Sequence, residues 1–265
     1  MDMANDLASE INSSTAEQLM LQATAFNGEL LAIKADKKVD WYPYGSMGNV
    51  QHLCQILPVG VMEQLVAGGL DWRVLDVGAA DGDLGYFFES RGSQVDFLDN
   101  PPTNYNDCKG IAELRTQLRS NARLVKQDID RNITLDGQYD FALALGLLYH
   151  LRNPMAFLMT LAEHAERMVL STRVASNLPD GTNIADSSIA YLLRCRESNN
   201  DPTNYWIFSR TGLETILRRS GWVVKTSYFF GAEQSNPVDP SADQRMFVYC
   251  DRVPNWHDLG KHHDF

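Results

Sequence analysis

The sequence is poor in cysteine and has neither a long apolar run nor a long basic run. Its four cysteines are widely separated and form no C-x-x-C pair, so we predict neither a zinc site nor a disulfide framework. No apolar stretch approaches the length of a membrane span. The first residues are acidic and lack the basic and apolar regions of a signal peptide, so we expect a cytoplasmic protein with no membrane attachment.

Acidic residues outnumber basic ones. The 265 residues include 34 Asp and Glu against 23 Lys and Arg, which gives a formal net charge of −11. Proteins that bind nucleic acid typically carry a basic surface, because phosphate contacts dominate their affinity. We therefore expect a small or neutral substrate rather than a polynucleotide. The length suits one large domain, or one domain with a small extension, and leaves a homo-oligomer open.

A strand, a turn of small residues and a helix follow one another from residue 72 onward. Residues 72–77 form a short apolar run of the kind found in buried parallel strands. The turn at 78–82 lets backbone N–H groups approach a ligand closely, and a helical pattern follows it. A second apolar strand, 94–98, ends on Asp99, where a carboxylate commonly accepts hydrogen bonds from the ribose hydroxyls of a nucleoside.

The charges around this turn distinguish two classes of ligand. Dinucleotide-binding folds use G-x-G-x-x-G and place a pyrophosphate at the helix N-terminus. Here the turn carries three carboxylates, Asp76, Asp81 and Asp83, which would repel a pyrophosphate and suit a cationic ligand. A nicotinamide-dependent oxidoreductase is therefore disfavoured.

The pattern Asp76-x-Gly78-x-Ala80-x-Gly82 resembles motif I of class I S-adenosylmethionine (SAM) methyltransferases. The resemblance implies a Rossmann-like α/β fold, with a seven-stranded sheet and helices on both faces, and alternating strands and helices from Asp71 onward agree with it. It also implies SAM as the cofactor and S-adenosylhomocysteine (SAH) as the product, with the following residues at the cofactor: Asp76, Gly78, Ala79, Ala80, Gly82, Asp99, Asn100, Asp128, Ile129, Leu145 and Gly146.

Two segments flank the predicted SAM-binding domain at 71–255. Residues 1–70 form a helical extension whose aromatic segment contains Trp41 and Tyr42; it either folds over the cofactor as a lid or plugs the helices onto the core. The tail at 256–265 contains two adjacent histidines that cannot face one metal from a helix or strand, so no metal site is predicted. Within the domain, the polar insertion at 176–208 is long for a connection and predicts a functional segment.

The segment from Gly146 to Pro154 resembles G-x-L-Y-H-x-x-x-P of the family that includes the tRNA wobble-uridine carboxymethyltransferase and its smaller methyltransferase relatives. This resemblance, which covers about residues 71–249, places Tyr149 at the methyl end of the cofactor, His150 beside it, and Arg245 in the pocket. The lysine and tryptophan residues of that family's carboxymethyl pocket have no assigned counterpart here. Methyl transfer is therefore favoured, with carboxymethyl transfer to tRNA from a carboxylated SAM analogue as the alternative.

His150 is the natural general base for a hydroxyl acceptor, because imidazole titrates near neutral pH; the alternative is a packed histidine. In the insertion we expect substrate contacts from Arg194, Arg196 and Tyr205, although such arginines more often pair with a neighbour such as Glu197. We expect a SAM-dependent methyltransferase that acts on an O or N atom of a small-molecule or sugar-like acceptor. A SAM-binding scaffold without catalysis is the alternative from another class.

Overall fold

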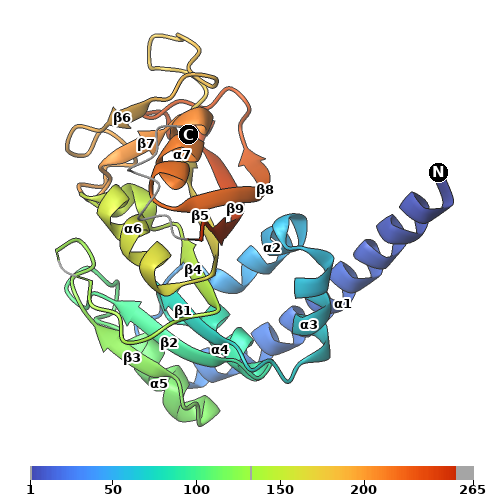
Figure 1. Ribbon diagram of the computed structural model, residues 1–265. Helices are drawn as coiled ribbons and strands as arrows, with labels where there is room; N and C mark the ends of the chain where they lie inside the picture. Colours follow the sequence, from blue (N-terminus) through green and yellow to red (C-terminus); the bar gives the residue numbers. More distant parts are fainter. Residues whose placement is uncertain (1, 132, 255–265) are drawn as a thin grey trace. The chain divides into compact units, whose positions relative to one another are not determined.

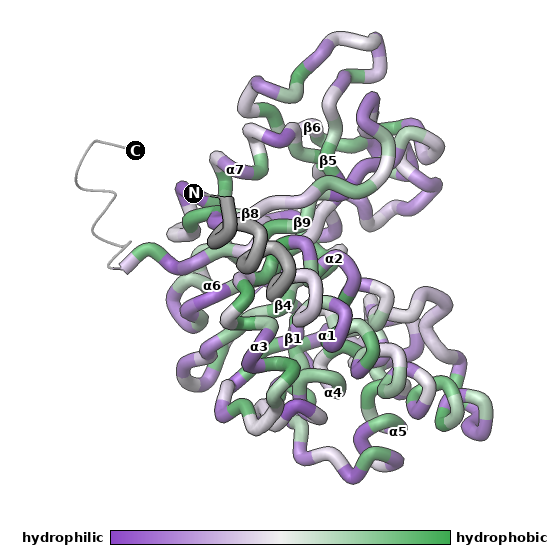
Figure 2. Tube along the Cα trace, turned by 90° about the vertical axis from the view of Figure 1, so that its right-hand side faces the viewer, coloured by the Kyte–Doolittle hydropathy of each residue, from purple (hydrophilic) through white to green (hydrophobic). Residues whose placement is uncertain are grey.

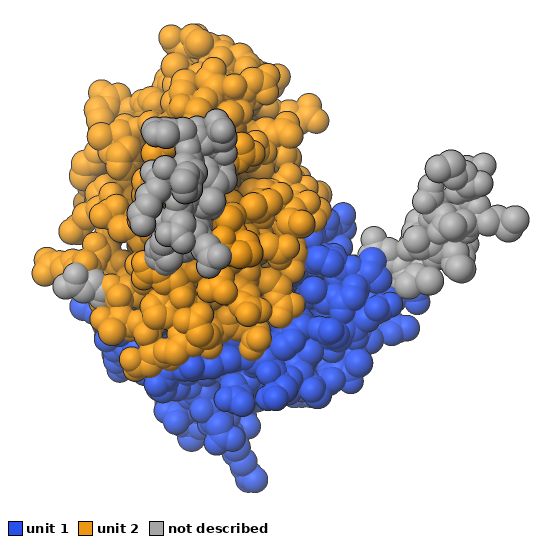
Figure 3. Space-filling model, in the orientation of Figure 1, with its two compact units in different colours: residues 1–127 blue, residues 128–265 orange. Residues whose placement is uncertain are grey.

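The computed structural model describes residues 2–131 and 133–254, with side chains from residue 13 onward (Figure 1). These residues form two compact units, 1–127 and 128–265 (Figure 3). The predicted tail at 256–265 lies outside the described residues. Within the described part of the chain, no helix has the length and apolar character needed to cross a membrane.

Unit 1 begins with helices. The long α1 (Asp2–Asp36) is followed by a 3-10 turn η1 (Ser46–Asn49), α2 (Val50–Ile56) and α3 (Val59–Ala67). Leu19, Ala23 and Leu30 are buried on one face of α1, at spacings of about one and two helical turns. This face packs mainly against α3 and α2. Figure 2 colours the chain by hydropathy and shows α1 beside the other elements of unit 1.

The rest of unit 1 is a parallel sheet with its connecting helices. The strands are β1 (Arg73–Val77), β2 (Gln94–Asp99) and β3 (Arg123–Lys126), with β2 in the middle; the helices are α4 (Asp83–Ser90) and α5 (Lys109–Leu118). Val77 pairs with Leu98 and Asp99 pairs with Lys126, so all three strands end at one edge of the sheet. The turn after β1 and the carboxylate that ends β2 therefore lie side by side at this edge.

Unit 2 holds the other strands. They are β4 (Phe141–Leu145), β5 (Arg167–Val174), β6 (Ala190–Leu192), β7 (Trp206–Phe208), β8 (Trp222–Gly231) and β9 (Gln244–Arg252). β4 and β5 are parallel, β9 is antiparallel to both β5 and β8, and β7 pairs with the end of β5 and with β6. The helical elements are η2 (Leu148–His150), α6 (Pro154–His164), α7 (Arg210–Arg219) and η3 (Pro240–Ala242).

The prediction of a Rossmann-like α/β fold is confirmed, and the described residues contain nine strands where seven were expected. The two additional strands, β6 and β7, lie within or beside the insertion 176–208. Each has only three residues, too few to show the alternation of apolar and polar residues that predicts a strand, and Leu192 of β6 is 61% exposed. Pairing with β7 over Leu192↔Trp206 and its neighbours holds it in place.

Candidate functional site

The turn after β1 has the backbone conformation that its small residues predict. Gly78, Ala80 and Gly82 all have positive φ, at 65°, 56° and 84°. A side chain on Gly82 would lie 3.0 Å from the ring of Phe97, so this position needs glycine on both conformational and steric grounds. Asn104 Nδ2 donates to the carbonyl of Ala80 at 3.1 Å and fixes the turn.

Four buried carboxylates lie in or beside this turn, and two of them, Asp76 and Asp99, are each 6% exposed. Burial, followed by the charge of Asp99, raises the pKa of Asp76 from 3.8 to about 7. Burial also raises the pKa of Asp99, although Asn104 Nδ2 and the backbone N–H of Asn100 donate to its two oxygens at 3.1 and 2.8 Å. Two desolvated carboxylates at one sheet edge fit a ligand that brings an ammonium group and hydroxyl donors.

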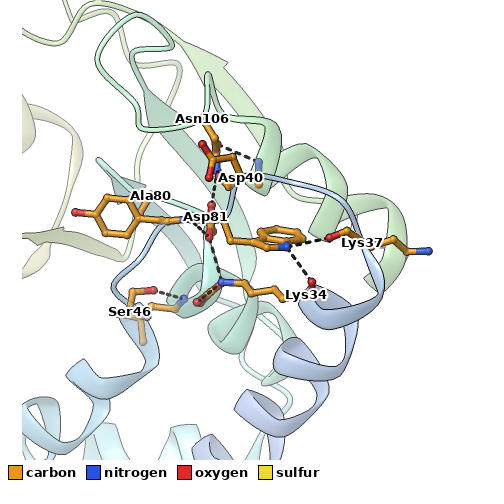
Figure 4. A network of polar contacts seen from close by, with 12 residues as sticks. Lys34, Lys37, Asp40, Ser46, Ala80, Asp81 and Asn106 are labelled. Atoms are coloured by element: carbon orange, nitrogen blue, oxygen red, sulfur yellow. Dashed lines mark hydrogen bonds and ion pairs between the residues drawn. The ribbon is translucent and has the colours of Figure 1, made fainter.

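The other two carboxylates of this stretch, Asp81 and Asp83, already have partners within the protein. Figure 4 shows the contacts of Asp81. Asp81 accepts from Lys34 Nζ at 3.1 Å, from the backbone N–H of Tyr42 at 3.0 Å and from Asn106 Nδ2 at 2.8 Å. Lys34 Nζ also lies 2.8 Å from the carboxylate of Asp83. The expectation that all three carboxylates suit a cationic ligand is corrected here, because Lys34 is the cation for Asp81 and Asp83.

The aromatic segment after α1 contacts Lys34 and Asp81 as well. Trp41 Nε1 donates to the carbonyl of Lys34 at 3.0 Å, and Lys34 Nζ lies 5.3 Å from the centre of the Trp41 ring. The ring of Tyr42 makes edge contacts with the rings of Tyr44 and Tyr105, with centroids 5.7 and 5.8 Å apart. Trp41 thus packs on the end of α1, in agreement with the alternative that the aromatic segment holds the N-terminal helices on the core. A contact of Trp41 or Tyr42 with the cofactor stays a prediction.

In unit 2, the segment after β4 brings together four of the predicted residues. Gly146, with φ of 72°, turns the chain from β4 toward η2, and its N–H donates to the carbonyl of Ser171 at 2.9 Å. The Tyr149 hydroxyl accepts from Arg245 Nη2 at 3.3 Å, and the rings of Tyr149 and His150 lie 4.2 Å apart. Tyr149 is 8% exposed and His150 is half-buried. Leu145, half-buried at the end of β4, precedes this group.

The surroundings of His150 favour its neutral imidazole form. Burial lowers its pKa below the usual 6.5, and Arg245 acts in the same direction, while Asp201 and the backbone of Thr203 oppose them. Its Nδ1 lies 3.0 Å from the hydroxyl oxygen of Thr203 and 3.3 Å from the carbonyl oxygen of the same residue. A neutral imidazole at neutral pH can accept a proton, as a general base must.

The predicted substrate residues of the insertion have partners of their own. Arg194, 86% exposed, pairs with Glu197 at 2.6 Å, the alternative considered for it from the sequence. Arg196 Nη1 lies 3.5 Å from Asn200, and the Tyr205 hydroxyl accepts from Arg152 at 3.1 Å. The backbone of Tyr205 contacts the group around Tyr149, since its N–H donates to the Tyr149 carbonyl at 2.8 Å.

The predicted adenine residues lie at the start of unit 2. Asp128 is half-buried and pairs with Arg131 at 3.3 Å, and Ile129 next to it is half-buried. Neither has a contact that decides its role, so both stay predictions.

Sequence reasoning missed a buried arginine in unit 2. Arg173, 2% exposed, contacts Asp243 and Ser198, and it lies directly opposite Arg245 in the β5–β9 pairing. Asp243 also lies 3.9 Å from Arg245. A single arginine at the end of an apolar strand gives no sign that its partner stands 70 residues further along the chain.

Comparisons with known proteins agree with this geometry. Residues 23–227 match the family model described as a methyltransferase domain. Among solved structures, the N-terminal domain of EvdMO1 with SAH bound is 21% identical over 86% of this chain and 96% of its own, with a TM-score of 0.52. A structure of the same domain in the presence of SAH and D-fucose has the same coverage and TM-score at 18% identity.

A third similar structure is a protein of Bacillus halodurans C-125 assigned as a methyltransferase. It is 12% identical over 73% of this chain and 97% of its own, with a TM-score of 0.54. At such identities the solved structures show a shared fold. No curated protein matches the chain. The family match covers most of the chain, so the chain belongs to the methyltransferase-domain family, and the predicted class of enzyme, a SAM-dependent methyltransferase of Rossmann-like fold, is confirmed.

Proposed function

We propose that this chain transfers the methyl group of SAM to an oxygen or nitrogen atom of a small-molecule or sugar-like acceptor. The observation that carries the proposal is the pair of desolvated carboxylates, Asp76 and Asp99, at the edge where a glycine turn follows β1. The acidic net charge supports a small acceptor over a polynucleotide. The EvdMO1 domain solved in the presence of SAH and D-fucose supports a sugar-like one.

Each predicted cofactor residue has a role in this proposal. Asp99 accepts from the ribose hydroxyls, and Asp76 holds the ammonium of the methionine end, since each is a buried carboxylate with no cation paired to it among the described residues. The backbone of the turn, with Gly78, Ala79, Ala80 and Gly82, gives the methionine end room. The other residues proposed to line the cofactor are Asn100, Asp128, Ile129, Leu145, Gly146, Trp41 and Tyr42. SAM itself supplies a methyl group activated by its sulfonium.

The residues of unit 2 supply alignment and proton removal. The acceptor hydroxyl gives its proton to the imidazole of His150, which is neutral because burial lowers its pKa. The hydroxyl of Tyr149 is held by Arg245 and lines the methyl-transfer site. In such a displacement the protein contributes mainly by aligning the two reactants. Arg194, Arg196 and Tyr205 remain candidates for contacts with a larger acceptor.

Carboxymethyl transfer to tRNA is a second candidate, and one observation favours it. Arg245 places a cation 3.3 Å from the Tyr149 hydroxyl, where a carboxylated SAM analogue would present its carboxylate. Two observations speak against carboxymethyl transfer, because these cations already have carboxylate partners. Lys34 pairs with Asp81 and Asp83, and Arg245 and Arg173 both lie beside Asp243. Methyl transfer therefore remains the better supported reaction.

Calorimetric titration with SAM, SAH and carboxy-SAM tests the choice of cofactor. We expect SAM and SAH to bind, and Asp99→Ala to weaken binding by about 1–3 kcal/mol, because charged hydrogen bonds to the ribose are lost. Asp107→Ala is the matched control, an exposed carboxylate of the same unit that pairs with Lys109. Unchanged SAM affinity in Asp99→Ala would refute the ribose assignment, and exclusive binding of carboxy-SAM would favour the tRNA reaction.

The acceptor is then sought by measuring SAH production with panels of sugars, hydroxylated small molecules and undermodified tRNA. Release of SAH with a small molecule and not with tRNA would support the proposal. SAM binding with no turnover on any class would favour the non-catalytic scaffold instead.

A further inference from the structure

The imidazole of His150 is the first member of a chain of three polar groups in unit 2. Its Nδ1 lies 3.0 Å from Thr203 Oγ1, and Thr203 Oγ1 in turn donates to Asp201 Oδ1 at 2.6 Å. The same Nδ1 lies 3.3 Å from the carbonyl oxygen of Thr203. Thr203 therefore presents two oxygens to one ring nitrogen.

The directions of these hydrogen bonds determine the tautomer of His150. A hydroxyl has a single proton, and Thr203 gives its proton to the carboxylate of Asp201, a short and charge-assisted contact. Toward His150 the hydroxyl oxygen can then only accept, as the carbonyl oxygen must. Both oxygens therefore require a proton on Nδ1, which leaves the lone pair of the neutral ring on Nε2.

The loop that carries Thr203 is built to hold this position. The backbone N–H of Thr203 donates to the same Asp201 Oδ1 at 2.8 Å, and the N–H of Asp201 donates to the Ser198 carbonyl at 3.1 Å. Two residues further on, the N–H of Tyr205 donates to the carbonyl of Tyr149 at 2.8 Å. The loop is thus bound to η2 beside the imidazole that it contacts.

Two charged groups act on His150 from different elements. Asp201 lies on the loop and favours the imidazolium, while Arg245 on β9 disfavours it. The ring of Tyr149, in η2, packs against the imidazole, with the two ring centres 4.2 Å apart. Asp201 is therefore the group that stabilises positive charge on the ring when it accepts a proton, through the hydroxyl of Thr203.

We propose that Thr203 and Asp201 are positioning residues for His150, fixing its tautomer so that Nε2 faces the acceptor as the base. The inference rests on the proposed function, because it assumes that His150 removes a proton from the acceptor. The arrangement follows the logic of catalytic triads, in which a carboxylate orients an imidazole and stabilises its protonated form. Here a threonine hydroxyl stands between the carboxylate and the ring.

The first test is the tautomer itself, measured by nitrogen-15 NMR of histidine-labelled protein with His150→Gln as the assignment standard. In the wild-type protein we expect a protonated Nδ1 and an unprotonated Nε2 on His150 at neutral pH. Thr203→Val removes the hydroxyl and should shift part of the population to the opposite tautomer. A wild-type His150 with its proton on Nε2 would overturn the inference, whether or not the protein transfers methyl groups.

The second test is the pH profile of kcat/KM, measured with the acceptor that the SAH-production assay identifies. We expect Thr203→Val to lower kcat at least about tenfold with unchanged Kd for SAM. Asp201→Asn removes the group that raises the pKa of His150, so the fall of kcat/KM on the acid side should move to lower pH. Wild-type rates and an unmoved profile in both variants would refute the positioning role and leave the methyltransferase activity standing.

A matched control exists in the same unit. Asp180 and Thr182 form the same kind of turn, with the N–H of Thr182 donating to Asp180 Oδ1 at 2.9 Å, and both are exposed. Thr182→Val and Asp180→Asn should therefore change neither the tautomer of His150 nor the pH profile. If the wild-type protein binds SAM but methylates nothing, the catalytic part of both proposals fails, and the tautomer measurement still decides the hydrogen-bond chain.

Discussion

Asp76→Asn should stabilise the ligand-free protein, and the gain should grow with pH. Burial and the nearby Asp99 raise the pKa of Asp76 from 3.8 to about 7. A rise of that size corresponds to roughly 4 kcal/mol of unfavourable free energy once the group is ionised in both the folded and unfolded states. Asparagine has nearly the same shape and carries no charge, so it removes this penalty.

The sign follows from proton binding. Between the unfolded and folded pKa of Asp76, the folded protein holds a proton that the unfolded chain has released, so stability falls as pH rises from about 4 to about 7. At about pH 5 only part of the penalty is present, and at about pH 8 nearly all of it is. The stability difference between Asp76→Asn and wild type should therefore increase by roughly 2–3 kcal/mol between these two conditions.

Urea unfolding of both proteins at the two pH values measures this difference directly. Subtracting wild type from variant cancels the titration of the groups that they share. A difference that stays constant with pH would show that Asp76 is ionised normally and that its burial is compensated in another way. The same residue should make SAM binding tighten as pH rises through about 7 in the wild type, because only the ionised carboxylate attracts an ammonium group.

Two further substitutions test the packing around the turn. Lys34→Met should lower the free energy of unfolding by about 3–5 kcal/mol, because it leaves Asp81 and Asp83, whose side chains are 2% and 4% exposed, without their cation. Its control is Lys109→Met, which breaks an exposed ion pair and should change the free energy of unfolding little. Gly85→Ala should cost about 1–3 kcal/mol, since its Cβ would lie 2.3 Å from the ring of Phe97. Gly28→Ala, where a Cβ meets nothing within 4 Å, should be neutral or stabilising in α1. Urea unfolding measures all four, and equal effects in a test variant and its control would contradict the packing argument.

Much of the fold could be predicted because its signals are local. The apolar run before Gly78 and the small residues of the turn specify a strand and a left-handed turn within a dozen residues, and the structure has both. Asp99 follows a second strand, and parallel pairing brings it to the same edge. The three-residue β6 escaped prediction because its pairing partner, and not its own sequence, makes it a strand.

The polar contacts of the site could not be predicted, because each joins residues far apart in the chain. Lys34 and Asp81 are separated by 47 positions, and His150 and Thr203 by 53. Composition and spacing place each residue on its element and say nothing of which side chain it meets. His150 was predicted as a base from its residue type and neighbours alone; its contacts with Thr203 became visible only with the loop in place.

Lys34 shows how such a contact changes the interpretation of a motif. From the sequence, three carboxylates around a turn suggest a strongly negative site for a cation. In the structure two of them share one ion-pair partner, Lys34 near the end of α1, whose carbonyl also accepts from Trp41 Nε1. In the proposed site, the turn therefore offers the cofactor one carboxylate, Asp76, together with Asp99 from the next strand. Asp81 also accepts from the N–H of Tyr42, so the ion pair of Lys34 with Asp81 links α1 and the aromatic segment to the turn after β1. Removing Lys34 should therefore weaken the attachment of both α1 and the aromatic segment to this turn.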